Sequence, residues 1–201
     1  MRIGIYGGTF DPVHYGHLVL AETCREACGL DEVWFIPAQV SPHKLDVRVS
    51  PPGARVDMLE FAIAGIPEFK VVRMELDRPG PSYTVDTLEQ IGRDRPDDEL
   101  FLFLGADSVA DFPTWRDPQR IAELATLVVV NRGREAPRLA SLELFRPGSR
   151  GTLEVEMPGI DLSASGIRQR IAQGKSIRFQ VPRAVEHYIR EKRLYLTSEP
   201  A

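Results

Sequence analysis

The sequence predicts an α/β protein with a mostly parallel β-sheet and a C-terminal helical segment. Short apolar runs rich in β-branched and aromatic residues recur, and the stretches between them have helical periodicity. The runs are "IGIY" from Ile3, "VWFIP" from Val33, "FKVV" from Phe69, "LFLFLG" from Leu100 and "LVVVN" from Leu127. Alternating strands and helices are typical of a parallel sheet covered by helices. We therefore expect a Rossmann-like, doubly wound arrangement.

The first helical stretches carry start and stop signals. The helix after the first strand runs through Leu18 to Cys28, and Gly29 is expected to end it. A second helix is expected over Arg55–Ala64. A third begins near "SYTVDTLEQI", where Ser82 or Thr84 could cap it.

Two more helices are expected near the end of the chain. Ser163 is the expected N-cap of "ASGIRQRIAQG", and Gly174 is its stop. Pro182 then opens a final helix, "PRAVEHYIREKR". Residues 132–150 are rich in proline, glycine and arginine with weak periodicity, so we expect a surface excursion there.

Length and charge favour one domain over residues 1–201, with a C-terminal helical part at about 163–195. The 201 residues are 43% hydrophobic, enough for one sizeable core, whereas a second would be cramped. A net charge of -4 excludes the global basic field that nucleic-acid binding needs. Residues 163–195 nevertheless hold eight basic side chains against two acids. That excess suits a small anionic ligand, although a solvated helical face explains it about as well.

Cysteine content and hydropathy indicate a reducing, aqueous environment. Cys24 and Cys28 lie four apart within a predicted helix, where an unstrained disulfide is disfavoured, so we expect reduced thiols in a packing role. Two cysteines without histidines at ligand spacing make a zinc site improbable. The stretch "MRIGIYGG" is expected to form a strand and has no long apolar h-region, and the sequence has no run of 18 apolar residues. We expect a soluble cytoplasmic protein that does not bind membranes.

The stretch "GGTFDPVHYGH" follows the first strand, at the edge of the sheet where open parallel sheets bind ligands. Gly7 and Gly8 allow backbone amides to approach a ligand closely. His14 and His17 share one face of a first helical turn, and Gly16 exposes the backbone between them. Such donors beside a helix N-terminus favour phosphate. The stretch is neither GxGxxG nor a Walker A loop, so another kind of phosphate site is predicted.

The same stretch resembles the HxGH signature of the nucleotidyltransferase superfamily, in the version of the bacterial nicotinate-nucleotide adenylyltransferase family. Other stretches match that family in order and spacing: "SPHK" from Ser41, "LGADS" from Leu104, "FPTW" from Phe112, "LSASGIR" from Leu162 and "VPRAVEHYIREKRLY" from Val181. The resemblance covers nearly the whole chain, least of all 132–150. The family's late motif usually reads Ile-Ser-Ser-Thr-x-Ile-Arg. Here Ala164 lacks one hydroxyl, while Ser165 keeps the hydroxyl of the usual threonine.

The resemblance implies transfer of the adenylyl group of ATP to nicotinate mononucleotide, giving deamido-NAD and pyrophosphate in NAD biosynthesis. The acceptor phosphate is already an anion, so the protein needs to position reactants and neutralise charge. The catalytic residues would be His14, His17, Lys44 and Arg168. ATP would bind at Gly7, Gly8, Thr9, Phe10, His17, Asp107, Ser163, Ser165 and Arg168. Mg²⁺ is expected to accompany ATP on substrate oxygens and waters, so no protein ligand is named.

The nicotinate carboxylate is the feature that would distinguish the second substrate. Thr84 at a helix start offers an amide and a hydroxyl beside the positive end of the helix dipole. Trp115 offers a flat face to the pyridine ring, and Tyr83 is a weaker candidate, since a tyrosine at a helix start often only packs. These three residues are the expected nicotinate mononucleotide site.

Four other functions are alternatives to this one. The nearest are an amide-preferring adenylyltransferase and a pantetheine-phosphate adenylyltransferase, although the latter family usually has a shorter chain and threonine in place of His14. A nucleotide-binding regulator would keep the phosphate site without turnover. A tRNA-charging enzyme would need an anticodon-binding region that this chain lacks. The sequence leaves open a homo-oligomer and the ratio of preference for acid over amide.

Overall fold

The computed structural model describes residues 1–39, 49–131 and 149–196. Within these ranges six strands form one sheet in the order β3-β2-β1-β4-β5-β6, and every neighbouring pair is parallel. The strands are β1 (Arg2–Gly8), β2 (Glu32–Pro37), β3 (Phe69–Val71), β4 (Glu99–Gly105), β5 (Thr126–Asn131) and β6 (Thr152–Glu156). The predicted doubly wound α/β fold is confirmed.

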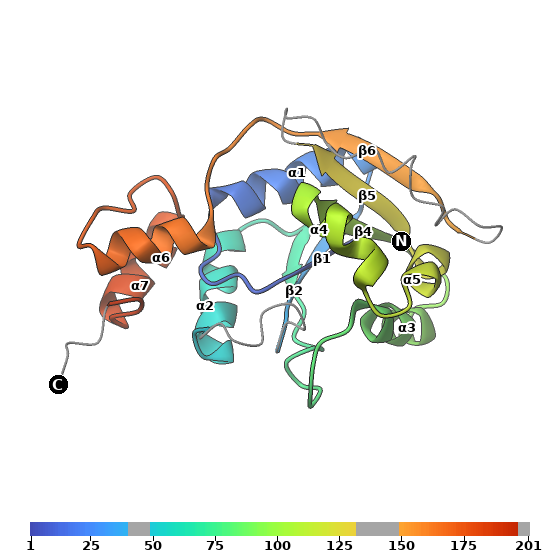
Figure 1. Cartoon of the computed structure of the whole chain (residues 1–201), viewed down its shortest axis with the longest axis horizontal. Helices are drawn as coiled ribbons and strands as arrows, with labels where there is room; N and C mark the ends of the chain where they lie inside the picture. Colours follow the sequence, from blue (N-terminus) through green and yellow to red (C-terminus); the bar gives the residue numbers. More distant parts are fainter. Residues whose placement is uncertain (40–48, 132–148, 197–201) are drawn as a thin grey trace.

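Helices cover both faces of this sheet (Figure 1). One face is packed by α1 (Tyr15–Cys28) and α2 (Pro52–Ile63), and α6 (Ala164–Ala172) and α7 (Arg183–Glu191) extend the same apolar core beside α2. The other is packed by α3 (Thr84–Asp94), α4 (Ala106–Asp111), the 3₁₀ turn η1 (Phe112–Thr114) and α5 (Pro118–Leu124). In Figure 1, α6 and α7 lie together at the left, beside α2. The C-terminal helical segment therefore shares the apolar core of α1 and α2 and packs against α2.

Side-chain alternation along β4 explains the two cores. Phe101 and Phe103 join the core under α1 and α2, whereas Leu100, Leu102 and Leu104 join the core under α3 and α5. Successive residues of a strand point to opposite faces. A strand that is apolar at every position must therefore be covered on both sides.

The helix boundaries confirm most of the expected start and stop signals. Gly29 ends α1 in the left-handed conformation, with φ of 58°, and the Ser163 hydroxyl caps α6 by accepting from the Gly166 amide at 3.1 Å. The predicted caps of α3 are wrong, because Tyr83 is its N-cap and no side chain caps it. Ser82 lies just before that position, and its hydroxyl accepts from the Gln39 amide at 3.0 Å instead.

Four further features bear on the expectations from the sequence. Strand β6 was not predicted, because in "TLEVE" only Val155 is buried and the apolar signal is weak. Cys24 and Cys28 are buried free thiols, as expected. The predicted excursion at 132–150 falls almost wholly outside the described residues. No helix in the described part of the chain is long and apolar enough to cross a bilayer.

Candidate active site

The candidate site lies at the carboxyl end of β1, where the strand order changes direction. Strand β1 pairs with β2 on one side and with β4 on the other. The crevice at such a switch point is where open α/β sheets bind ligands. A Cβ added at Gly7 would meet no atom within 4 Å, so the strand end is open above its backbone.

The Phe10 ring supports the loop from within. Its side chain is only 2% exposed and lies edge-on to Tyr6 at 5.3 Å and to His17 at 5.2 Å between ring centroids. A Cβ on Gly8 would approach the Phe10 ring to 2.9 Å, so this glycine makes room for the protein's own aromatic ring. Any contact that Phe10 offers to ATP must therefore come from its backbone.

His14 and His17 lie together as the sequence predicts. Their rings are stacked, with centroids 3.7 Å apart and planes 27° apart. The His14 amide donates to Nδ1 of His17 at 3.2 Å. An accepting Nδ1 places the proton of a neutral imidazole on Nε2, where it can be donated to an anion. Gly16 has a role that sequence reasoning missed, because a Cβ there would lie 3.0 Å from the His14 ring.

The start of α6 is tied to the same loop. Nη1 of Arg168 donates to the carbonyl oxygen of Asp11 at 2.7 Å. The Ser163 and Ser165 hydroxyls lie 3.3 Å apart in the first turn of α6. The structure thus brings a guanidinium, two hydroxyls and a helix N-terminus toward the loop that carries the histidines. Such groups together favour an anion.

The residues predicted for nicotinate form a second group at the start of α3. Trp115 follows η1 and packs against Phe112, with ring centroids 5.4 Å apart. The Arg116 guanidinium lies 4.7 Å from the centroid of the Tyr83 ring, and Thr84 is the first residue of α3. This group adjoins the end of β2 through the bond from the Gln39 amide to Ser82.

The structure gives only the backbone position of Asp107 and does not describe Lys44. Asp107 is the second residue of α4, directly after β4, so it does not occupy the N-cap position, which belongs to Gly105. Lys44 lies outside the described residues. Among the residues that the structure describes, no group of three or more His, Cys, Asp and Glu side chains is arranged to hold a metal ion.

A polar network beneath the loop was missed by sequence reasoning. Asp11 is 2% exposed and Arg55 is 0% exposed, and both bond to backbone groups around them. Burial lowers the pKa of Arg55, while the Asp11 carboxylate acts in the opposite direction. One signal could have found it: Arg55 stands beside Val56, Met58 and Leu59 in the buried face of α2. A charged residue on an apolar helix face needs a buried partner.

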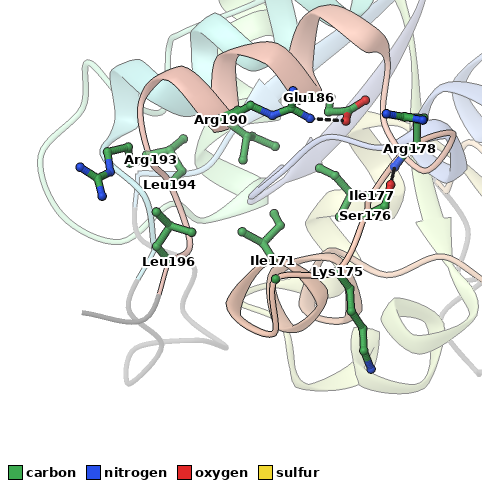
Figure 2. A pocket seen from close by; sticks show the side chains of 12 residues that line it. Ile171, Lys175, Ser176, Ile177, Arg178, Glu186, Arg190, Arg193, Leu194 and Leu196 are labelled. Carbon is green, nitrogen blue, oxygen red and sulfur yellow. Dashed lines mark hydrogen bonds and ion pairs between the residues drawn. The ribbon is translucent and has the colours of Figure 1, made fainter. Parts of the chain in front are cut away.

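The basic excess of residues 163–195 divides between two places. Arg168 reaches the loop, but several others surround a separate cavity of about 370 Å³ between α6 and α7 (Figure 2). In Figure 2, the charged ends of Lys175 and Arg193 point away from this hollow, and Arg190 pairs with Glu186 at 3.0 Å. The interior is lined by Ile171, Ile177, Ile189 and Leu194. The lining of this cavity therefore mixes apolar side chains with basic ones, and it is separate from the loop that carries the histidines.

Comparisons with known proteins identify the family. The cytidylyltransferase-like family model matches residues 5–170. A Thermus thermophilus protein named "Probable nicotinate-nucleotide adenylyltransferase" is 47% identical over 97% of this chain and 100% of its own length. One of the same name from Thermomicrobium roseum is 44% identical over 98% of this chain and 93% of its own.

Solved structures support the fold. The nicotinic acid mononucleotide adenylyltransferase of Plasmodium falciparum, solved as a complex with NaAD, superposes with a TM-score of 0.79. The superposition covers 96% of this chain and 97% of that chain at 20% identity. From the family match and the near full-length relatives together, the chain belongs to the cytidylyltransferase-like family and, within it, to the nicotinate-nucleotide adenylyltransferases.

Proposed function

We propose that this chain transfers the adenylyl group of ATP to nicotinate mononucleotide, forming deamido-NAD and pyrophosphate. One observation carries the proposal: the stacked His14 and His17 rings at the N-terminus of α1, with the His17 tautomer set by the His14 amide. The relatives that share 44% to 47% of the sequence bear the name of this activity. Small-molecule substrates and a cytoplasmic location are part of the proposal.

The reaction requires that the negative charge of the phosphates be neutralised. It requires no general base, because the attacking phosphate is already an anion. A phosphate oxygen of nicotinate mononucleotide attacks the α-phosphorus of ATP, and the bond from that phosphorus to the bridging oxygen breaks. Pyrophosphate leaves with the electron pair. In this proposal His14 and His17 donate to the triphosphate as negative charge builds on it. Mg²⁺ is part of the substrate, coordinates phosphate oxygens and waters, and neutralises further charge.

The remaining ATP contacts divide among three segments. The open strand end at Gly7, with the backbone of Gly8, Thr9 and Phe10, would receive phosphate oxygens. Ser163, Ser165 and Arg168 at the start of α6 would also bind the phosphates, and Asp107 would contact the adenosine side or the metal-bound phosphates. Lys44 completes the proposed set from outside the described residues.

Recognition of the acid rests on the group around α3. Thr84 begins the helix, so its amide and hydroxyl lie at the positive end of the dipole, where a carboxylate gains more than a carboxamide. Trp115 is held against Phe112 and offers a ring face for the pyridine. Tyr83 lies under the Arg116 guanidinium, which lends positive charge to the same region.

A comparison of acceptors tests this proposal. Pyrophosphate release is measured with ATP and Mg²⁺ and equal concentrations of nicotinate mononucleotide, nicotinamide mononucleotide or phosphopantetheine. We expect release with the acid to exceed that with the other two clearly. Equal rates with nicotinate mononucleotide and nicotinamide mononucleotide would refute the proposed recognition of the carboxylate, but would still support nucleotidyl transfer. ATP binding without pyrophosphate release from any acceptor would instead favour a nucleotide-binding regulator.

A further inference from the structure

A buried aspartate links four parts of the chain that lie far apart in sequence. Oδ2 of Asp11 accepts from the Ser50 amide at 2.9 Å, and Oδ1 accepts from the Tyr195 hydroxyl. The carbonyl oxygen of the same residue accepts from Arg168 at 2.7 Å. Asp11 therefore joins the loop after β1 to the segment before α2, to α6 and to the turn after α7.

Arg55 holds the other side of the same loop. Its Nη1 donates to the carbonyl oxygen of Thr9 at 3.0 Å, and its Nε donates to that of Ser50 at 3.2 Å. Thr9 and Asp11 are the two neighbours of Phe10, whose backbone is left-handed, with φ of 50°. That conformation is unusual for an aromatic residue and persists only where the surroundings enforce it.

The position of Phe10 affects the histidines because its ring contacts the His17 ring. Its ring lies 5.2 Å from the His17 ring and nearly perpendicular to it, at 71°. A shift of the Phe10 backbone would therefore move the surface against which His17 rests. Since His17 in turn stacks on His14, both donors depend on the shape of the loop.

Tyr195 is suited to be a permanent donor in this network. Burial, followed by the nearby Asp11 carboxylate, raises the pKa of the Tyr195 hydroxyl. The hydroxyl therefore stays protonated at neutral pH and can donate. Its bond spans 184 residues of sequence, from the end of the described chain to the loop beside the histidines.

We propose that Tyr195 and Arg55 are positioning residues, which act through Asp11 and Thr9 to hold the loop that presents His14 and His17. The inference rests on the proposed adenylyl transfer for its kinetic readout only. Neither residue needs to touch a substrate. Loss of the Tyr195 hydroxyl should leave the protein folded but should let the loop depart from the orientation that the transition state requires.

The chain provides a matched control for this test. Tyr188 on α7 also donates its hydroxyl to a carboxylate, Oδ2 of Asp57 on α2, at 2.6 Å. Like Tyr195, it ties the C-terminal segment to the region of α2, but its bond does not involve the loop. Comparing Tyr195→Phe with Tyr188→Phe therefore separates the anchoring of the C-terminal segment from the positioning of the histidines.

Steady-state kinetics are measured for both variants after their urea midpoints confirm a folded state. We expect Tyr195→Phe to lower kcat about tenfold, with little change in KM for nicotinate mononucleotide, because a lost hydrogen bond that acts on the transition state changes kcat. Tyr188→Phe should keep kcat within about twofold of the parent. Equal kcat values in the two variants would overturn the proposal.

A second readout does not depend on activity. The chain has four histidines, so their imidazole signals can be followed individually by NMR. We expect Tyr195→Phe to shift the signals of His14 and His17, and Tyr188→Phe to leave them in place. Unshifted signals in Tyr195→Phe would refute the positioning role even if the parent proved inactive toward nicotinate mononucleotide. A parent without pyrophosphate release but with shifted signals would refute the proposed function alone.

Discussion

The glycine between the two histidines shows how one residue depends on another in this motif. A spacing of three brings His14 and His17 together, but the stacked rings crowd the position of a side chain at the residue between them. At Gly16 a Cβ would lie 3.0 Å from two atoms of the His14 ring. The absence of a side chain at Gly16 therefore leaves space for the His14 ring, in addition to any exposure of backbone to a ligand.

His17 is expected to matter more for rate than for folding. His17→Ala removes the Nε2 donor, and a donor aimed at developing charge contributes about 2.7–4 kcal/mol to the transition state. Turnover should fall about a hundredfold or more, measured as pyrophosphate release at saturating substrates. His187→Ala is the control, because His187 is exposed on α7 and lies outside the proposed site. Near-normal turnover of His17→Ala would remove His17 from the mechanism.

Glu75 should make stability depend on pH. It is 7% exposed, and burial raises its pKa in the folded protein, against the bond from Thr87 at 2.7 Å. The stability that this carboxyl contributes is complete below its unfolded pKa and is lost as pH rises through the folded value. Glu75→Gln should therefore stabilise the protein by on the order of 1 kcal/mol at pH 7.5.

Urea midpoints at pH 4 and pH 7.5 test this prediction. At pH 4 the parent carboxyl is largely protonated in both states, so the advantage of Glu75→Gln should largely disappear. Exposed Glu60 supplies the control, since Glu60→Gln should not change the difference between the two pH values. An advantage of equal size at both pH values would mean that the glutamine stabilises by packing and that the charge of Glu75 is immaterial.

At the scale of elements, apolar runs predicted five strands because each is buried on at least one face. Strand β4 is apolar from Leu100 to Leu104 and was unambiguous, whereas β6 places glutamates beside Val155 at the sheet edge and could not be recognised. The start of α3 was misjudged for a related reason. The Ser82 hydroxyl is used by the Gln39 amide, a tertiary contact over 43 residues that no local rule contains.

Two glycines near helix ends predict opposite effects of one substitution. Gly29 ends α1 with φ of 58°, so an alanine there would be strained in the left-handed region. Gly92 lies within α3 with no atom within 4 Å of an added Cβ, so alanine gains helix propensity. Gly29→Ala should destabilise the protein by about 1 kcal/mol, and Gly92→Ala should stabilise it by up to about 1 kcal/mol.

Urea unfolding of the two variants, followed by circular dichroism, measures these shifts against the parent. Each variant controls for the other, because both add the same methyl group and remove the same backbone freedom from the unfolded chain. Shifts of the same sign would show that backbone conformation does not decide the outcome at these two sites.

At the scale of the whole molecule, the site depends on contacts that cross most of the sequence. The histidine pair was predictable from its spacing at a helix start, since the side chain at N3 folds back to the N-cap residue, here His17 to His14. The contact of Arg168 with Asp11 spans 157 residues, and that of Tyr195 with Asp11 spans 184. Neither leaves a local pattern in the sequence. Local order is thus readable from short stretches, whereas the support of the site arises only when both ends of the chain meet.

Because these contacts join the two ends of the chain, we propose that residues 1–201 unfold as one cooperative domain. The two faces of the sheet carry separate probes. Trp34 and Trp115 pack against the core under α3 and α5, and Cys24 and Cys28 are buried in the core under α1 and α2. Burial raises the pKa of Cys24 to about 12, so its thiol reacts slowly until that face opens.

Tryptophan fluorescence and pulse labelling of thiols along one urea series should therefore give the same midpoint. Strands β1, β2 and β4 contribute residues to both cores, so neither face can lose its packing while the other keeps an intact sheet. Because Arg168 and Tyr195 fasten the C-terminal segment to the loop after β1, Tyr195→Phe should lower both midpoints together. Thiol labelling at clearly lower urea than the fluorescence change would instead mean that the α1 face and the C-terminal segment form a separate unfolding unit.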